Sequence, residues 1–135
     1  MTKMTKEDAL IREIFEPGRK GTQALASAVR EAGKLLFEER VAMDDILVTK
    51  DIYPVVARQL GKDSRNIARQ VERLANQCWD GMDEEQKKRY IGKELKDIRA
   101  PKDVIFYLAF YVRFRQGFYR VLEKEPGLLF GKRDS

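Results

Sequence analysis

The chain has 135 residues, of which 43% are hydrophobic and 36% charged, and its formal net charge is +5. This length and composition fit a single folded domain and differ from the composition of disordered segments. The absence of histidine excludes His-based catalytic triads, His-containing zinc sites and phosphohistidine chemistry, and the single cysteine excludes an intramolecular disulfide.

Nothing else in the sequence indicates catalysis or a cofactor. Gly18 and Gly21 lie in a PGRKG segment that lacks the Lys-Ser or Lys-Thr pair of a phosphate-binding loop. The acidic residues lie in mixed-charge runs, without the apolar surroundings that acid catalysis requires. No apolar run approaches the roughly 20 residues of a membrane helix, and the first residues lack the apolar core of a signal peptide. We therefore expect a cytoplasmic protein that is not an enzyme and has no metal, cofactor, membrane or small-molecule substrate.

Helical periodicity predominates, and no segment alternates as a strand does, so the fold class is all-α with about six helices. Helices are predicted over 5–15 and 22–39, separated by Pro17-Gly18. The second helix has an apolar stripe at spacings of three and four. The stripe comprises Leu25, Ala28, Val29, Ala32, Leu35 and Leu36, and Arg30, Glu31, Lys34 and Glu38 are expected off it. Residues 40–48 form either a turn or a short helix.

Two helices with a tight junction are predicted over about 51–79, the pattern of a helix-turn-helix. Asp51 is expected to cap the first helix, with Pro54 in its first turn and Gly61 just past its end. Its expected buried residues are Ile52, Val55, Val56 and Leu60. Asp63 or Ser64 caps the second helix, which is predicted to run to Trp79. A short helix within 83–90 and a final helix from 101 to about 123 follow.

The second helix of this pair has two contrasting faces. Its predicted buried stripe comprises Ile67, Val71, Leu74, Ala75, Cys78 and Trp79. The opposite face comprises Arg65, Asn66, Arg69, Gln70, Arg73, Asn76 and Gln77. Arginine matches the acceptors of guanine, and asparagine and glutamine match the edge of adenine. The face therefore predicts major-groove reading of duplex DNA by Arg65, Asn66, Arg69, Gln70 and Arg73. Arg58, Lys62 and Ser64 at the junction are expected to contact the DNA backbone, with Lys50 a weaker candidate.

At these residues the sequence resembles a known family. Ile52-Tyr53-Pro54, Ala57-Arg58 and the ungapped segment to Trp79, including Arg69, Val71 and Ala75, are similar to the C-terminal effector domain of stage-zero sporulation protein A, the response regulator that starts sporulation in endospore-forming bacteria. Weaker similarity in Arg30-Glu31-Ala32, Tyr90-Ile91-Gly92 and the helix after Pro101 extends the resemblance over about 22–119.

The resemblance implies a six-helix domain that binds specific duplex DNA, often as adjacent copies on tandem sites, so a homodimer or tandem copies are the expected assemblies. Arg69 carries over to the family's base-reading face. Glu72, Arg73, Asn66 and Ala68 stand where the family has a basic residue, His, Arg and Glu, so the family's recognition sequence is not expected here. About twenty residues precede the similarity, too few for the family's phosphorylatable receiver domain.

The expected organisation is an N-terminal helix and linker at 1–21, the DNA-binding domain at 22–125 and a tail at 126–135. The N-terminal helix either packs on the domain, binds a partner or mediates dimerisation. The aromatic residues of the final helix are interpreted as its hydrophobic spine, with an oligomer interface or single-stranded nucleic acid as alternatives. They are Phe106, Tyr107, Phe110, Tyr111, Phe114, Phe118 and Tyr119, interleaved with Arg113, Arg115 and Arg120. The competing function is a protein-interaction module, an inhibitor or adaptor, that keeps the fold without binding DNA.

Overall fold

The computed structural model describes residues 5–14, 22–92 and 101–125, without the side chains of 101 and 102. In these residues it is all-helical and contains no strand, which confirms the predicted fold class. The α-helices are α1 (Lys6–Ile14), α2 (Gln23–Gly33), α3 (Tyr53–Leu60), α4 (Ser64–Gly81), α5 (Glu84–Ile91), α6 (Pro101–Phe114) and α7 (Phe118–Lys124). They are accompanied by two π-helical segments, η1 (Lys34–Glu38) and η3 (Val48–Ile52), and the 3-10 turn η2 (Met43–Asp45).

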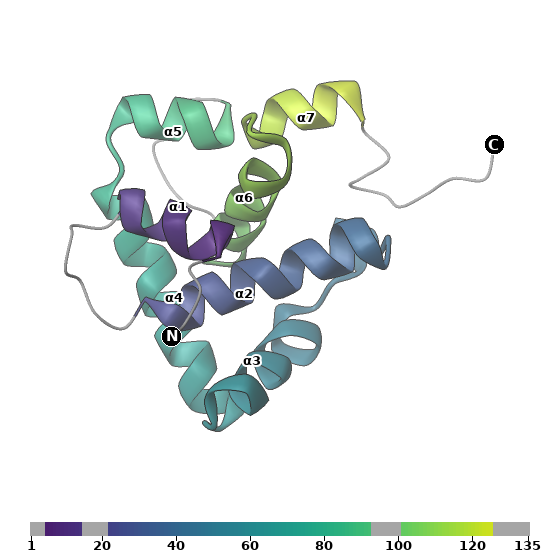
Figure 1. The fold of residues 1–135 in the computed structure, drawn as a ribbon, viewed down its shortest axis with the longest axis vertical. Coiled ribbons are helices and arrows are strands. Elements are labelled where there is room, and N and C mark those ends of the chain that lie inside the picture. The colour runs from purple at the N-terminus through teal and green to yellow at the C-terminus, as the bar shows by residue number, and fades with distance from the viewer. Residues whose placement is uncertain (1–4, 15–21, 93–100, 126–135) are drawn as a thin grey trace.

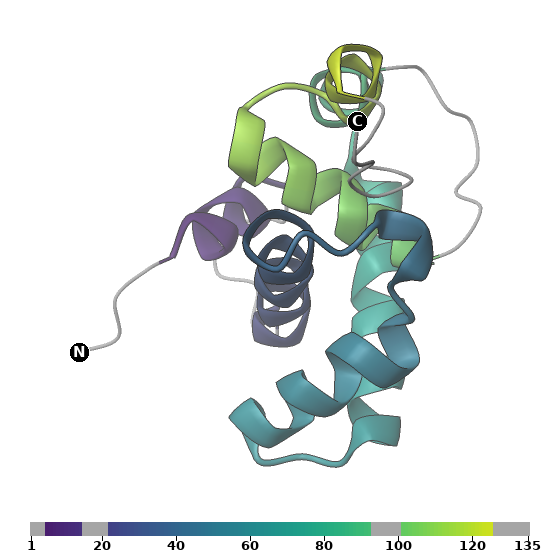
Figure 2. The ribbon, with the colours of Figure 1, turned by 90° about the vertical axis from the view of Figure 1, so that its right-hand side faces the viewer.

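The helices are arranged around α2, which packs against α1, α3, α4 and α6. Helix α6 is a second centre of packing: besides α2 it contacts α1, α4, α5 and α7. Figure 1 shows α5 and α7 side by side at one end of the molecule and α3 at the other. In Figure 2 the turn between α3 and α4 lies at the tip of that second end, so the first turns of α4 project away from α5 and α7.

The N-terminal helix α1 belongs to the same hydrophobic core as the rest of the described chain. Leu10 and Ile11 are each 1% exposed, and Ile14 is also buried. These side chains pack between α2 and α6. Of the three roles open to this helix, packing on the domain is therefore observed.

Helix α2 continues as the π-helical segment η1, so the predicted helix over 22–39 is confirmed with a wider last turn. Glu31, expected off the buried stripe, is instead 8% exposed. The amide nitrogen Nε2 of Gln59 in α3 donates a 2.9 Å hydrogen bond to Glu31, and Lys34 forms a 3.6 Å ion pair with it. These partners replace the water that the carboxylate loses on burial, which is why a charged side chain is tolerated at position 31. Leu35 is only half-buried.

The cap predicted for Asp51 is wrong. Its carboxylate accepts a 2.9 Å hydrogen bond from the backbone amide of Leu47, four residues earlier, and so closes the turn of η3. Helix α3 starts after Ile52 without a side-chain cap, and Pro54 lies in its first turn as predicted. Ile52 and Val56 are buried as expected. Tyr53 and Ala57 are buried as well, whereas Val55 and Leu60 are half-buried.

The final helix begins at Pro101 as predicted, but the prediction that it runs to about 123 is wrong. It ends at Phe114, the chain turns through Arg115 at a φ of 55°, and α7 starts at Phe118. The cause is a close backbone contact: a Cβ on Gly117 would lie 2.6 Å from the backbone nitrogen of Gly92. The break lets α7 pack beside α5, which a continuous helix would not do.

The aromatic residues of α6 and α7 pack mainly on one another. Phe110 meets the rings of Phe118 and Phe37 edge-on, with centroid separations of 4.8 and 5.5 Å, and Tyr107 meets Phe118 at 4.9 Å. Phe106, Phe110 and Phe118 are at most 4% exposed. Together with the buried Tyr107 they form the predicted hydrophobic spine, because bases could not reach rings buried in this way. Tyr111, Phe114 and Tyr119 of the predicted set are half-buried.

Helix α5, predicted within 83–90, forms with a capping box in which Asp83 and Gln86 bond reciprocally to each other's backbone amides. The last turn of α4 holds Trp79, which is 4% exposed, with the ammonium of Lys87 4.6 Å from its ring centroid. Among the described residues, no helix has both the length and the apolar character needed to cross a membrane.

Candidate nucleic-acid interface

Three residues, 61–63, join α3 to α4. Gly61 has a φ of 68°, the left-handed conformation that glycine adopts without strain, and Lys62 donates a 2.9 Å backbone hydrogen bond to Ala57. Asp63 is extended and caps α4, since its Oδ1 accepts a 2.8 Å hydrogen bond from the amide of Asn66. Both helix ends are thus satisfied locally. The choice left open between Asp63 and Ser64 resolves to Asp63, and Ser64 is the first helical residue.

Helix α4 buries the whole of its predicted apolar stripe. The six residues Ile67, Val71, Leu74, Ala75, Cys78 and Trp79 are each at most 4% exposed. They face α2, α3 and α6, and this packing fixes which side of α4 turns outward. The helix extends to Gly81, two residues beyond the predicted end.

The outward face carries the predicted base-reading residues on one continuous surface. Arg65, Asn66, Arg69 and Arg73 are exposed, and Gln70 is half-buried at the edge of the stripe. Arg69 and Arg73 lie opposite the centre of the buried stripe, because successive residues turn by about 100°. No described residue forms a hydrogen bond or salt bridge with the side chains of Arg65, Arg69 or Arg73, so their donors are available to a ligand. Asn66 differs, because its Nδ2 donates a 3.3 Å hydrogen bond to Asp63.

The predicted backbone contacts surround the α3–α4 turn. Arg58 lies in the last turn of α3, Lys62 in the turn itself and Ser64 at the start of α4, and all three are exposed. Lys50 is exposed too but lies in η3, before α3 begins. The structure therefore brings the first three together at one end of the outward face.

Glu72 is an exposed acidic residue of α4 at the edge of this face. Burial and, as the smaller cause, the negative charge of Glu72 raise the pKa of Tyr53 to about 12. Glu72 therefore lies close enough to the start of α3 to act on Tyr53, and on α4 it is also within one turn of Arg69 and Arg73.

One connection between helices was not predicted. Gln59 of α3 bridges to Arg30 and Glu31 of α2, a connection that depends on tertiary packing and has no signal in the local sequence. Within the described residues, no group of three Cys, Asp or Glu side chains is arranged to hold a metal ion.

Comparison with protein-family models, with curated proteins and with solved structures finds no match to this chain. The assignment of a function therefore depends on the residues and geometry of α3 and α4, together with the sequence resemblance described above.

Proposed function

We propose that α3 and α4 form a helix-turn-helix and that the protein is a sequence-specific regulator of transcription that reads the major groove of duplex DNA with α4. One observation carries the proposal: the exposed face of α4 presents a row of three arginines that no described side chain neutralises. An ordinary solvated helix face instead carries glutamate and lysine in compensating pairs.

The dimensions of α4 suit this role. Arg65, Arg69 and Arg73 recur every fourth residue, so they follow about 12 Å of the helix axis at a rise of about 1.5 Å per residue. A single α-helix fits the major groove of B-DNA, whose width is about 12 Å. The first turns of α4 project at one tip of the molecule (Figure 2), where a groove can receive them without collision with α5 or α7.

In this proposal the residues divide by role. Arg69 and Gln70 read bases directly, Asn66 reads an adjacent base, and Arg65 and Arg73 contact either bases or flanking phosphates. The exposed residues around the turn, Arg58, Lys62 and Ser64, contact the phosphate backbone and fix the register of α4 in the groove.

The resemblance to the effector domain of stage-zero sporulation protein A supports duplex DNA as the partner. Under that resemblance the protein would act in sporulation, in the cytoplasm on the nucleoid, as a homodimer or as tandem copies. The departures at Glu72 and Arg73 mean that its DNA sequence has to be determined afresh.

The proposal is tested by selection of bound sites from random duplex DNA, followed by sequencing. Wild type is compared with Arg69→Ala and with Arg120→Ala, which removes the same charge from an exposed position in α7 at the other end of the molecule. We expect wild type and Arg120→Ala to enrich one common site. Arg69→Ala should lose about 1–3 kcal/mol of binding free energy and relax specificity at one base position.

A phosphate contact has a different signature. Lys62→Ala should weaken binding to all sequences by a similar factor and reduce the dependence of affinity on salt concentration. If the folded protein enriches no site at low salt, DNA reading is refuted. The outward face of α4, with Glu72 at its edge, would then be assigned to a protein partner.

A further inference from the structure

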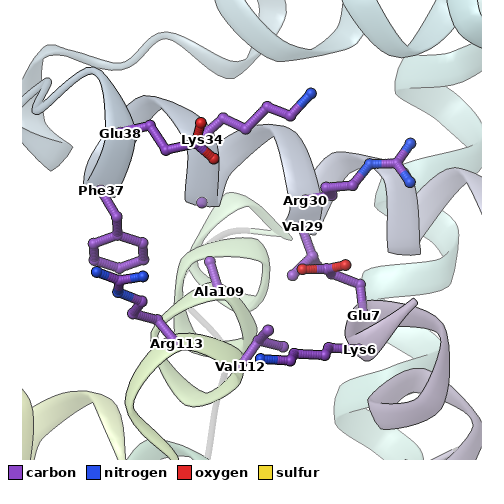
Figure 3. A pocket seen from close by; sticks show the side chains of 11 residues that line it. Lys6, Glu7, Val29, Arg30, Lys34, Phe37, Glu38, Ala109, Val112 and Arg113 are labelled. Atoms are coloured by element: carbon purple, nitrogen blue, oxygen red, sulfur yellow. The ribbon is translucent and has the colours of Figure 1, made fainter.

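A groove of about 330 Å³ lies between α1, α2 and α6, and the charges around it favour no particular ligand. The carboxylate of Glu7 lies over its apolar floor, whereas the side chains of Arg30 and Lys34 point away from the floor (Figure 3). Arg30 donates a 3.4 Å hydrogen bond to Gln59, and Lys34 pairs with Glu31 at 3.6 Å, so both cations already have partners. A charge without a partner, in a setting that favours one kind of ligand, lies instead on α4.

That charge belongs to Glu72, the only acidic residue of α4 before Asp80. Its side chain is exposed and forms no hydrogen bond or ion pair with a described residue. On a helix surface, residues three apart are neighbours, and opposite charges at that spacing are placed to pair. No ion pair nevertheless joins Glu72 to Arg69, three residues earlier. The carboxylate and the guanidinium are therefore both available to the same ligand.

The position of Glu72 places it in the groove with Arg69 in the proposed complex. It lies about 4.5 Å farther along the axis of α4 than Arg69 and is turned by about 60° around that axis. The turn is toward the start of α3, where burial and the charge of Glu72 raise the pKa of Tyr53. Between two rows of phosphates, a carboxylate that lost its water without gaining a donor would be costly.

Base pairs offer such a carboxylate two kinds of donor in the major groove, the N4 amino group of cytosine and the N6 amino group of adenine. The amino group of cytosine has one acceptor beside it, O6 of the paired guanine. The amino group of adenine lies between two acceptors, its own N7 and O4 of the paired thymine. A negatively charged acceptor is repelled by both of these, so cytosine is the better partner of a carboxylate.

We propose that Glu72 is a specificity-determining residue that accepts a hydrogen bond from N4 of a cytosine, in the base pair next to the guanine that Arg69 reads. The inference rests on the proposed function and deepens it. The spacing fits, since an offset of about 4.5 Å along α4 is close to the separation of about 3.4 Å between neighbouring base pairs. The same charge repels phosphate, so Glu72 also weakens binding to unrelated DNA.

Selection from random duplex DNA tests the base assignment, with Glu72→Gln beside wild type. Glutamine is a good helix former, and its amide matches adenine instead of cytosine. We expect the two proteins to enrich the same site except at one position, where wild type selects cytosine and Glu72→Gln selects adenine. Asp80→Asn removes the same charge from an exposed position in the last turn of α4 and should keep the cytosine. A wild-type site without that cytosine, or with the same base in Glu72→Gln, overturns the proposal.

Affinities for two duplexes, the wild-type site and an unrelated sequence, give a second test by fluorescence anisotropy. Glu72→Gln should bind the wild-type site at least about 5-fold more weakly and the unrelated duplex more tightly, because a base contact and a repulsion are lost together. A purely structural role for Glu72 would lower the stability of Glu72→Gln in urea unfolding and change both affinities in the same direction. That result overturns the proposal, as does unchanged affinity for both duplexes.

The outcomes also separate this inference from the proposed function. If folded wild type enriches no site at low salt, DNA reading itself fails and the role of Glu72 fails with it. If wild type and Glu72→Gln enrich one identical site that Arg69→Ala weakens, DNA reading stands and only the role of Glu72 is refuted.

Discussion

The cap of α4 allows a test in which stability and DNA binding change separately. Asp63 accepts hydrogen bonds from the amide of Asn66 at 2.8 Å and from its Nδ2 at 3.3 Å, at the end of the helix that carries the proposed reading residues. Asp63→Ala removes both acceptors. Loss of an N-terminal cap costs about 0.5–2 kcal/mol, typically about 1 kcal/mol.

The corresponding change in melting temperature follows from the size of the chain. Unfolding entropy is about 2.1 cal/mol/K per residue, so 135 residues give about 0.28 kcal/mol/K. A loss of about 1 kcal/mol in Asp63→Ala should then lower the melting temperature by about 3–4 °C. Circular dichroism during thermal and urea unfolding measures both quantities.

Two matched variants separate the contributions to this loss. Asp63→Asn keeps an acceptor of similar capping strength but removes the charge, so its unfolding free energy should stay within about 0.5 kcal/mol of wild type. It should also bind duplex DNA at least as tightly, because a carboxylate near the proposed phosphate contacts is gone. Asp83→Ala removes the cap of α5 and should destabilise by a similar amount without affecting DNA. Asp63→Ala as stable as wild type would refute the capping argument.

Three further outcomes are expected. Gly117→Ala should lose about 1–3 kcal/mol of stability in urea unfolding, because its Cβ would lie 2.6 Å from the backbone nitrogen of Gly92, whereas Gly81→Ala, with nothing within 4 Å, should lose none. Burial raises the pKa of the Cys78 thiol to about 12, so iodoacetamide should modify it at neutral pH only as fast as the protein unfolds, and rapid modification of native protein would contradict this. Burial and Glu72 raise the pKa of Tyr53 from 10.0 to about 12. The folded state favours the neutral phenol, so this contribution to stability is complete below pH 10.0 and is lost between pH 10.0 and about 12, a loss that Tyr53→Phe should reduce in alkaline denaturation curves.

Local patterns in the sequence predicted α4 and its turn closely. The apolar stripe of α4 recurs at helical spacing over several turns, so one face had to be buried and all six stripe residues are. Gly61 lies directly after α3 and takes the left-handed conformation that ends it. The exposure of Arg65, Arg69 and Arg73 follows from the same stripe. Periodicity predicts only which residues of the candidate interface are exposed.

The predictions that failed depend on distant partners. Glu31 is buried because Gln59, 28 residues away in sequence, donates to it. The last helix breaks because Gly117 meets the backbone of Gly92, a contact between the ends of other elements. Asp51 had two available roles, since a carboxylate accepts equally from a following or a preceding amide, and η3 selects the amide of Leu47.

The position of Trp79 gives the molecule an intrinsic optical reporter. It is the single tryptophan of the chain, it is buried, and it lies 16 residues after Asp63, about 24 Å along the axis of α4. Its emission should therefore be that of an indole shielded from water, with the ammonium of Lys87 beside the ring. DNA bound at the first turns of α4 would not touch this indole. A change in its emission spectrum on binding would therefore report a movement of α4 as a whole against α5. A constant spectrum would report that α4 binds without moving against α5.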